Sequence, residues 1–210
     1  ERLYREVLSI SDEIGDRWGE ELALDNLGNL AYDREDWDEA ERLYREGLEI
    51  NREIGNRSSE SYSLSDLGDI ARRREDWDEA ERLFKESLAI RRELGDHSEI
   101  EVYLLGDLGE ISRFREDWGE AERLYKEGLA VCLEIDDREL EALLLSQLGL
   151  NASGRDDYEE AERLHREALA IRREIGDKRA TGESLGSLGN VAFDREDWGE
   201  AERLYKEFVR

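Results

Sequence analysis

A nine-residue motif returns along the chain at nearly constant intervals, and this periodicity constrains the fold more than any other feature. Its first complete copy runs from Asp36 and reads Asp-Trp-Asp-Glu-Ala-Glu-Arg-Leu-Tyr, with related copies from Asp76, Asp117, Asp157 and Asp197. A second landmark accompanies every copy, at Leu27-Gly28, Leu67-Gly68, Leu108-Gly109, Leu148-Gly149 and Leu188-Gly189. Both landmarks step by 40, 41, 40 and 40 residues. Such a period is typical of stacked structural repeats. We therefore expect a row of similar units that pack on their neighbours and do not share one central core.

Each unit is predicted to form two helices joined by a short turn. In the first helix, Leu24, Leu27 and Leu30 follow the three-and-four spacing of a buried helical face. Before the second helix, Asp36 is a natural N-cap, and Glu39 completes a pair that resembles a capping box. The second helices end at glycines suited to a left-handed C-cap, Gly15, Gly55, Gly95 and Gly176, while at Asp136 the glycine is absent.

Small residues at fixed places indicate that the two helices of a unit lie close together. A glycine inside a helix costs about 1 kcal/mol relative to alanine, so we expect Gly28, Ala40 and Gly47 to serve close packing. One extra residue lies between Gly95 and Gly109, in or beside the turn at Asp96-His97-Ser98. We expect one solenoid over 1–210, with a partial unit at 1–14, full units at 17–55, 57–95, 97–136 and 138–176, and a shortened unit at 178–210.

These landmarks resemble those of the tetratricopeptide repeat over essentially the whole chain. In the first full unit the matching residues are Leu24, Leu27-Gly28, Trp37, Ala40, Tyr44 and Gly47. The chain departs from the usual period of about 34 residues, and it contains no proline to close the second helix. In this it is similar to the long repeats of Leu-Gly-Asn (Pins-like) adaptors and kinesin light chains, and to sensor arrays of some prokaryotic regulators. The resemblance implies an all-α, right-handed solenoid of about five antiparallel helix pairs.

The variable face of each first helix is the predicted binding surface. The resemblance implies that this face lines a concave groove, where such proteins bind extended or helical peptides. We therefore expect the chain to bind a protein or peptide through Asn29, Tyr32, Tyr62, Asp69, Arg72, Arg73, Tyr103, Arg113, Phe114, Asn190 and Phe193. Other positions on the same face are Leu22, Leu143, Leu150 and Glu183.

Three arginines, Arg72, Arg73 and Arg113, are expected in the middle of this groove. Guanidinium groups pair with carboxylates, and aromatic neighbours add stacking area; the neighbours expected here are Tyr62, Tyr103 and Phe114. One interpretation is therefore a pocket for an acidic side chain or a C-terminal carboxylate of the partner. The other is internal pairing across adjacent helices, with Asp69, Glu75 and Glu110.

The charge of the chain disfavours negatively charged partners. It has 57 acidic against 31 basic residues and a formal net charge of -26, which repels the phosphates of nucleic acids and anionic membrane surfaces. No stretch approaches the 18 or so apolar residues of a membrane span. The acid excess, with four lysines among the basic residues, indicates either a solvated surface or adaptation to high salt.

The residues that usually carry chemistry are few, and we expect no enzyme, cofactor or metal. Cys132 is the only cysteine and falls on an apolar helix face, so it is predicted to be a small core residue. His97 lies in a turn, and His165 replaces an aromatic residue as a packing substitution. Neither has a companion at metal-ligand spacing, and no phosphate loop or nucleophile elbow is present.

Two other functions remain open at this stage. Solenoids need polar terminal caps, and the ends here are apolar at Leu3, Tyr4, Val7, Leu8, Phe208 and Val209, so the chain could assemble with itself head to tail. Alternatively, it is a sensor array of a larger regulator. The sequence opens at Glu1 within a repeat, as a fragment or processed form would, so a cytoplasmic location is only slightly favoured over export.

Overall fold

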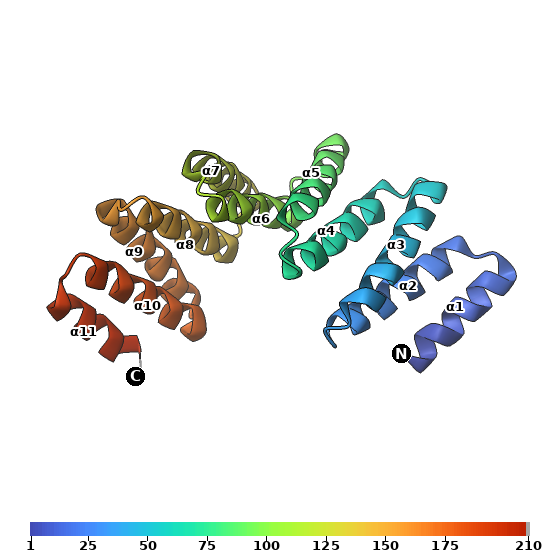
Figure 1. Cartoon of the computed structure of the whole chain (residues 1–210), viewed down its shortest axis with the longest axis horizontal. Helices are drawn as coiled ribbons and strands as arrows, with labels where there is room; N and C mark the ends of the chain where they lie inside the picture. The colour runs from blue at the N-terminus through green and yellow to red at the C-terminus, as the bar shows by residue number, and fades with distance from the viewer. Residues whose placement is uncertain (209–210) are drawn as a thin grey trace. The chain divides into compact units, whose positions relative to one another are not determined.

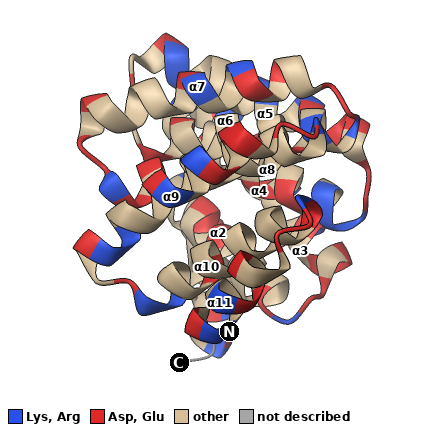
Figure 2. Cartoon of the chain, turned by 90° about the vertical axis from the view of Figure 1, so that its left-hand side faces the viewer, with Lys and Arg blue, Asp and Glu red and all other residues tan. Residues whose placement is uncertain are grey.

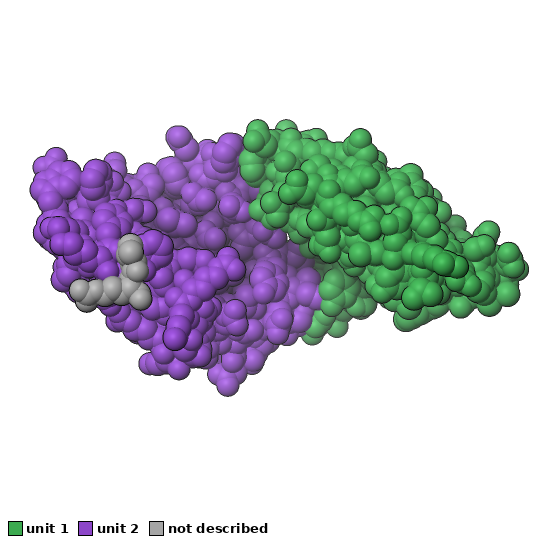
Figure 3. Space-filling model, turned by 90° about the horizontal axis from the view of Figure 1, so that it is seen from below, with its two compact units in different colours: residues 1–96 green, residues 97–210 purple. Residues whose placement is uncertain are grey.

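The computed structural model describes residues 1–208 and contains, within them, eleven α-helices and no strand (Figure 1). The predicted all-α class, an array of helical repeats, is confirmed. The chain divides into two compact units, residues 1–96 and residues 97–210, which Figure 3 draws in different colours. Because the two units have separate packing, each is described by itself.

Unit 1 has five helices that pack in chain order. They are α1 (Arg2–Ile14), α2 (Arg17–Tyr32), α3 (Trp37–Ile54), α4 (Arg57–Arg73) and α5 (Trp77–Leu94). The first helix of each repeat packs against its own second helix, α2 on α3 and α4 on α5, and α4 also packs on the preceding α3. Apolar side chains on the inner faces, such as Leu24, Leu43 and Leu64, are at most 3% exposed.

Unit 2 repeats this arrangement with six helices. They are α6 (Glu99–Phe114), α7 (Trp118–Ile135), α8 (Arg138–Gly154), α9 (Tyr158–Ile175), α10 (Lys178–Asp194) and α11 (Trp198–Phe208). α6 pairs with α7, α8 with α9 and α10 with α11, and each pair packs on the next. The first helices α6, α8 and α10 therefore occupy the same place in their repeats as α2 and α4 in unit 1.

Helix ends follow the predicted caps with one difference. The Asp36 side chain accepts a hydrogen bond from the backbone N–H of Glu39 at 3.3 Å, and the other four repeats do the same from Asp76, Asp117, Asp157 and Asp197. The return bond of a capping box does not form, because the Asp36 N–H already donates to the carbonyl of Ala31. The Glu39 carboxylate pairs instead with Arg42 at 2.9 Å.

Residues with a left-handed backbone conformation occur at two places in each repeat, and the sequence indicated only one of these places. The predicted glycine C-caps have φ between 64° and 80°, and Asp136 takes the same conformation at 58°. The turn inside each repeat also needs a residue with positive φ, and there the chain places an acid: Glu35, Glu75, Glu116, Asp156 and Glu196, with φ of 60° or 61°. A residue with a Cβ is strained in this region, where glycine is preferred.

The glycine of the Leu-Gly landmark is required by a close contact between the paired helices. A Cβ on Gly28 would lie 2.6 Å from the Tyr44 ring. The same addition would lie 2.4 to 2.7 Å from the matching ring at Gly68, Gly109, Gly149 and Gly189. The prediction of close packing is thus confirmed at Gly28. It is wrong at Gly47, where a Cβ would meet Leu24 at an ordinary 3.9 Å.

The extra residue of the third full repeat lies where it was predicted. At the other junctions between repeats the C-cap and the next N-cap are consecutive residues, as at Gly55 and Asn56. Here Asp96 and His97 separate the C-cap Gly95 from the N-cap Ser98. The division between the two units falls inside this turn, between Asp96 and His97.

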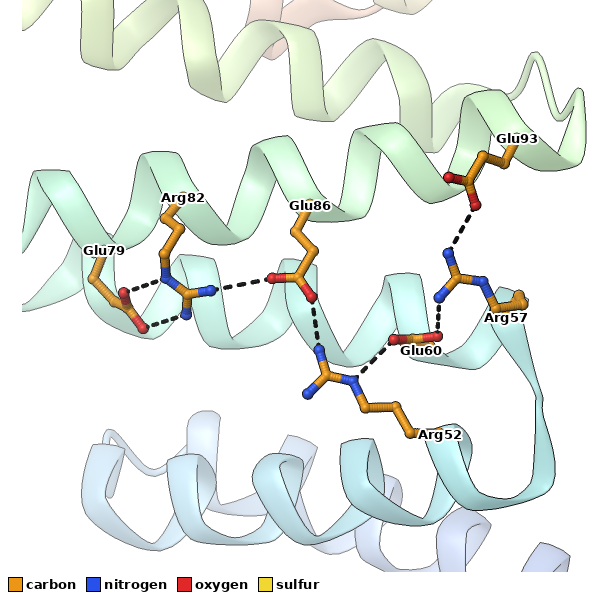
Figure 4. Close-up of polar contacts among 7 residues, drawn as sticks. All are labelled: Arg52, Arg57, Glu60, Glu79, Arg82, Glu86 and Glu93. Atoms are coloured by element: carbon orange, nitrogen blue, oxygen red, sulfur yellow. Dashed lines mark hydrogen bonds and ion pairs between the residues drawn. The ribbon is translucent and has the colours of Figure 1, made fainter.

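Ion pairs connect the surfaces of neighbouring helices. Figure 4 shows one network in unit 1, made by Arg52, Arg57 and Arg82 with Glu60, Glu79, Glu86 and Glu93. Arg52 of α3 contacts Glu60 of α4 at 2.9 Å and Glu86 of α5 at 2.7 Å. In Figure 2, basic and acidic segments are likewise interleaved along the helices. Many basic side chains are therefore engaged within the chain, although exposed pairs contribute at most about 1 kcal/mol each.

Candidate partner-binding surfaces of the two units

The predicted groove residues of unit 1 lie on α2 and α4, and several are held by internal contacts. Tyr32 packs edge to face on Trp37, with 5.0 Å between ring centroids. Its hydroxyl accepts a hydrogen bond from Arg73 at 3.3 Å, and the Arg73 guanidinium lies 6.0 Å from the ring centroid. The Tyr62 ring, 47% exposed, covers the guanidinium of the buried Arg91 at 4.2 Å.

The asparagine of the Leu-Gly-Asn signature has a structural partner that the sequence did not indicate. The Tyr44 hydroxyl donates to Oδ1 of Asn29 at 2.7 Å, and Tyr205 donates to Asn190 at the same distance. Asn29 also donates to Asp25 at 3.2 Å. Both asparagines are exposed, and these bonds fix their oxygen atoms to the paired helix.

The three predicted arginines divide between the units, with Arg72 and Arg73 in unit 1 and Arg113 in unit 2. Arg72 pairs with Asp69 at 2.7 Å, and Arg113 lies 4.0 Å from Glu110. Both pairs join residues three apart on one helix, whereas the internal interpretation expected pairs across adjacent helices. The reason is that a spacing of three already places the two side chains side by side. Their meeting in one pocket stays a prediction.

The predicted residues of unit 2 lie on α6 and α10 and present exposed rings. Tyr103, Phe114 and Phe193 are 52%, 60% and 51% exposed. Phe193 also contacts Trp198 edge to face, with 4.9 Å between centroids. Arg113 is half-buried beside Tyr125, whose pKa is raised to about 12 by burial and drawn back down by this arginine.

A cavity of about 390 Å³ lies in unit 2 where the N-terminal turns of its first helices meet. Three predicted groove positions line it, Tyr103 of α6, Leu143 of α8 and Glu183 of α10. The remaining lining residues are Glu99, Asp137, Glu139, Leu140, Arg172, Ile175, Asp177, Arg179 and Ala180. Sequence reasoning missed this grouping, because it joins residues of four helices that no landmark of the repeat connects.

The cavities of unit 1 have a different lining. One of about 710 Å³ lies between α3 and α5 with Leu64 and Leu67 of α4 at its floor. Its walls include Arg52, Arg82 and Glu86, which already pair with one another or with neighbouring carboxylates. A charged partner would have to displace these pairs, so this cavity is the weaker candidate.

Two carboxyl groups on the first helices of unit 1 are electrostatically unusual. Burial raises the pKa of Asp66 to about 7, and the charges of Asp25 and Asp69 act in the same direction. The pKa of Asp25 is also raised, mainly by burial. Within the described residues, the Asp66 carboxylate has no hydrogen-bond or ion-pair partner. The first helices of unit 1 thus carry a buried carboxyl group whose charge no hydrogen-bond donor or cation among the described residues offsets.

The histidines and the cysteine lie where the sequence placed them. Cys132 is 1% exposed, and burial raises the pKa of its thiol to about 11. His97 is an exposed turn residue that contacts Glu101 at 3.1 Å, and His165 is 1% exposed in the aromatic position. Among residues 1–208, no group of histidine, cysteine and acidic side chains is arranged to hold a metal ion. No helix in that range is long and apolar enough to cross a membrane.

Several solved structures have the same fold. BtubC (BKLC) from P. vanneervenii shares 22% identity over 100% of this chain and 88% of its own, with a TM-score of 0.87. A signal-transduction ATPase from Pyrococcus horikoshii with a tetratricopeptide repeat sensor shares 19% over 99% of this chain and 32% of its own, with a TM-score of 0.84. A Rap protein complexed with competence and sporulation factor shares 14% over 91% and 53%, with a TM-score of 0.77.

The sequence itself matches models of one family. Residues 59–134 and 139–210 match one tetratricopeptide repeat model, and residues 22–54 match a second. No curated protein matches the chain in sequence. Because the family matches cover most of its length and agree with the helix pairs, the chain belongs to the tetratricopeptide repeat family.

Proposed function

We propose that the chain is a non-catalytic protein-interaction scaffold that binds a peptide or protein partner along its first helices. The observation that carries the proposal is the exposure of large apolar side chains there. Those at least 41% exposed on α2, α4, α6, α8 and α10 are Trp18, Leu22, Tyr62, Tyr103, Phe114, Leu150 and Phe193. Apolar groups gathered on one face are typical of interaction sites.

The family and the fold support this proposal. Tetratricopeptide repeats are protein-interaction scaffolds as a class, and a Rap protein of the same fold has been solved in complex with competence and sporulation factor. Exposed aromatic rings are also suited to the role, because they bury a large area on binding with little loss of side-chain entropy.

A selection from a random peptide library on the immobilised chain tests the proposal. Selected peptides should bind Tyr62→Ala and Tyr103→Ala more weakly than the wild type, by about 1 kcal/mol or more if these rings anchor the peptide. Leu133→Ala is the control, because Leu133 is 71% exposed on the second helix α7. Peptides that bind all three variants and the wild type equally would refute the proposal, and so would a selection that yields no binder.

Self-assembly is a second candidate function, favoured by the exposed apolar side of α1. Leu3, Tyr4 and Val7 are 74%, 38% and 41% exposed, and Leu8 is half-buried. At the other end, Phe208 is 52% exposed and contacts Gly182, while Val209 lies outside the described residues. Size-exclusion chromatography with light scattering tests this idea: a mass of 24.5 kDa at all concentrations would refute it. Larger species that dissociate in Leu3→Glu would support it.

A further inference from the structure

The cavity of unit 2 carries a more specific inference about the partner, which rests on the proposed function. Among its lining residues are five carboxylates, Glu99, Asp137, Glu139, Asp177 and Glu183, and two guanidinium groups, Arg172 and Arg179. The lining therefore has an excess of negative charge. What the cavity can bind depends on which of these charges are already engaged.

Three of the five carboxylates have partners within the chain. Asp137 caps α8 by accepting from the backbone N–H groups of Glu139 and Leu140 at 3.0 and 2.9 Å. Asp177 caps α10 by accepting from Ala180 at 2.9 Å. Glu183 pairs with Arg179 at 3.3 Å.

The other two carboxylates, Glu99 and Glu139, are exposed and have no hydrogen-bond or ion-pair partner within residues 1–208. They lie near the phenol of Tyr103: burial raises its pKa, and the charges of Glu99, Asp137 and Glu139 raise it further. The Tyr103 ring is 52% exposed. An open aromatic ring beside unpaired carboxylates is the arrangement that attracts a cation.

Apolar groups of the same lining would receive the stem of a long basic side chain. Leu143 is half-buried and Ile175 is 44% exposed, and both line the cavity with Tyr103. Lysine and arginine place their methylene groups on such surfaces while their charged ends reach polar groups. The lining thus offers contacts to both parts of a basic side chain.

The lining also offers hydrogen-bond donors, at Arg172. Arg172 is 7% exposed, and its Nη1 donates to the carbonyl of Ala180 at 3.1 Å and to Ser184 at 2.7 Å. Its Nε and Nη2 atoms have no hydrogen-bond acceptor among the described residues. Burial lowers the pKa of Arg172, and the charges of Glu183 and Asp177 act in the opposite direction. Its remaining donors therefore suit a neutral acceptor, such as a backbone carbonyl.

We propose that this cavity binds a lysine or arginine side chain of the partner peptide, with the cation at Glu99, Tyr103 and Glu139 and a peptide carbonyl at Arg172. A single lysine or arginine residue supplies both groups, the cation on its side chain and the carbonyl on its backbone. Unit 2 would then prefer a basic group of the partner. One interpretation of the arginines in the sequence suggested the opposite, an acidic group.

The test compares three proteins: the wild type, Glu99→Gln/Glu139→Gln, and Glu134→Gln/Glu159→Gln. Both double variants remove two negative charges from exposed side chains of unit 2 without changing side-chain size, so long-range attraction falls equally in both. Each protein is used for a selection from a random 12-residue phage library. Each is then titrated with fluorescein-labelled Gly-Ser-Arg-Leu-Gly-Ser and Gly-Ser-Glu-Leu-Gly-Ser.

The wild type is expected to enrich lysine and arginine and to bind the arginine peptide more tightly than the glutamate peptide. Replacing Glu99 and Glu139 should weaken binding of the arginine peptide by about tenfold, since each contact contributes up to about a factor of five to the affinity. In the control variant Glu134→Gln/Glu159→Gln, the affinity for the arginine peptide should change less than twofold.

Three results would overturn the inference: equal loss in both double variants, preference for the glutamate peptide, or selected peptides without basic residues. Binding of such peptides would leave the proposed function intact, because it would show only that the cation site is wrong. Absence of any binder would refute both.

Discussion

His165 provides the sharpest test of how this chain packs its repeats. The residue is 1% exposed, neither ring nitrogen has a hydrogen-bond partner within the described residues, and the ring lies against Gly149. Burial lowers the pKa of His165 from 6.5 to about 4, and the charge of Arg172 acts in the same direction. The matching position in unit 1 is Phe84, which meets Gly68 at the same distance to within 0.1 Å.

The magnitude follows from the two pKa values of His165. Because the folded pKa lies below the unfolded one, the unfolded chain binds the proton first, and stability falls as the pH drops from 6.5 to 4. At about 1.4 kcal/mol for each pH unit between the two values, the loss reaches about 3 kcal/mol at pH 4. At pH 7.5 both states are neutral, and the remaining cost is that of two buried nitrogens without partners, about 1–3 kcal/mol.

His165→Phe should therefore be more stable than the wild type at pH 7.5 and should gain further as the pH falls to 4. Urea unfolding followed by circular dichroism measures the global effect, and hydrogen exchange of α8 and α9 locates it, since repeat arrays need not unfold in one step. Phe84→His is the reciprocal control and should introduce the same pH sensitivity in unit 1. The reasoning is refuted if His165→Phe keeps the pH dependence of the wild type or unfolds more easily at pH 7.5.

Four further substitutions test three other features. Gly28→Ala forces a Cβ to within 2.6 Å of the Tyr44 ring and should cost about 1–3 kcal/mol. Gly47→Ala meets only an ordinary contact and should gain up to about 1 kcal/mol from helix propensity; similar urea midpoints for the pair would contradict the packing account. Glu35→Gly should gain about 0.5–1 kcal/mol by relieving a residue at φ 60°, and a lower melting temperature would argue against strain there. Asp66 has a folded pKa of about 7 against 3.8, so its contribution to stability is full below pH 3.8 and is lost as the pH rises through 7. Asp66→Asn should stabilise the chain at pH 8 but not at pH 3.5, and a carboxyl titration near 4 by NMR would contradict this.

Local signals were sufficient to predict the helices and their ends. Asp36 and Gly55 act through backbone hydrogen bonds of their own neighbourhood, so the sequence predicts them without knowledge of the fold. Gly28 was predictable because a glycine recurs at this place in every repeat, in register with the position of the ring that it contacts. Glu35 was missed because an acid is not a residue that left-handed geometry favours, and only the recurring bonds of the turn impose that conformation.

The candidate surfaces were predictable only in part. The helical phase of the repeat places Tyr62, Tyr103 and Phe193 on the first helices with exposed rings. It does not determine which side chains pair, because that depends on rotamers and on the neighbouring helix. Arg72 was expected to be available to a partner or paired across helices, and it pairs with Asp69 on its own helix. The cavity of unit 2 combines residues of four helices, which no linear pattern joins.

The most direct test of the central claim is an NMR titration of the chain with a peptide selected from the random library. Binding along the first helices should change amide shifts along α6, α8 and α10, with the largest changes near Tyr103 and Leu143. The shifts of α7 should change little, and those of α9 should change only near Arg172 and Ile175 at its C-terminal end. Shifts confined to the second helices, or to the apolar side of α1, would contradict the claim that the first helices bind the partner.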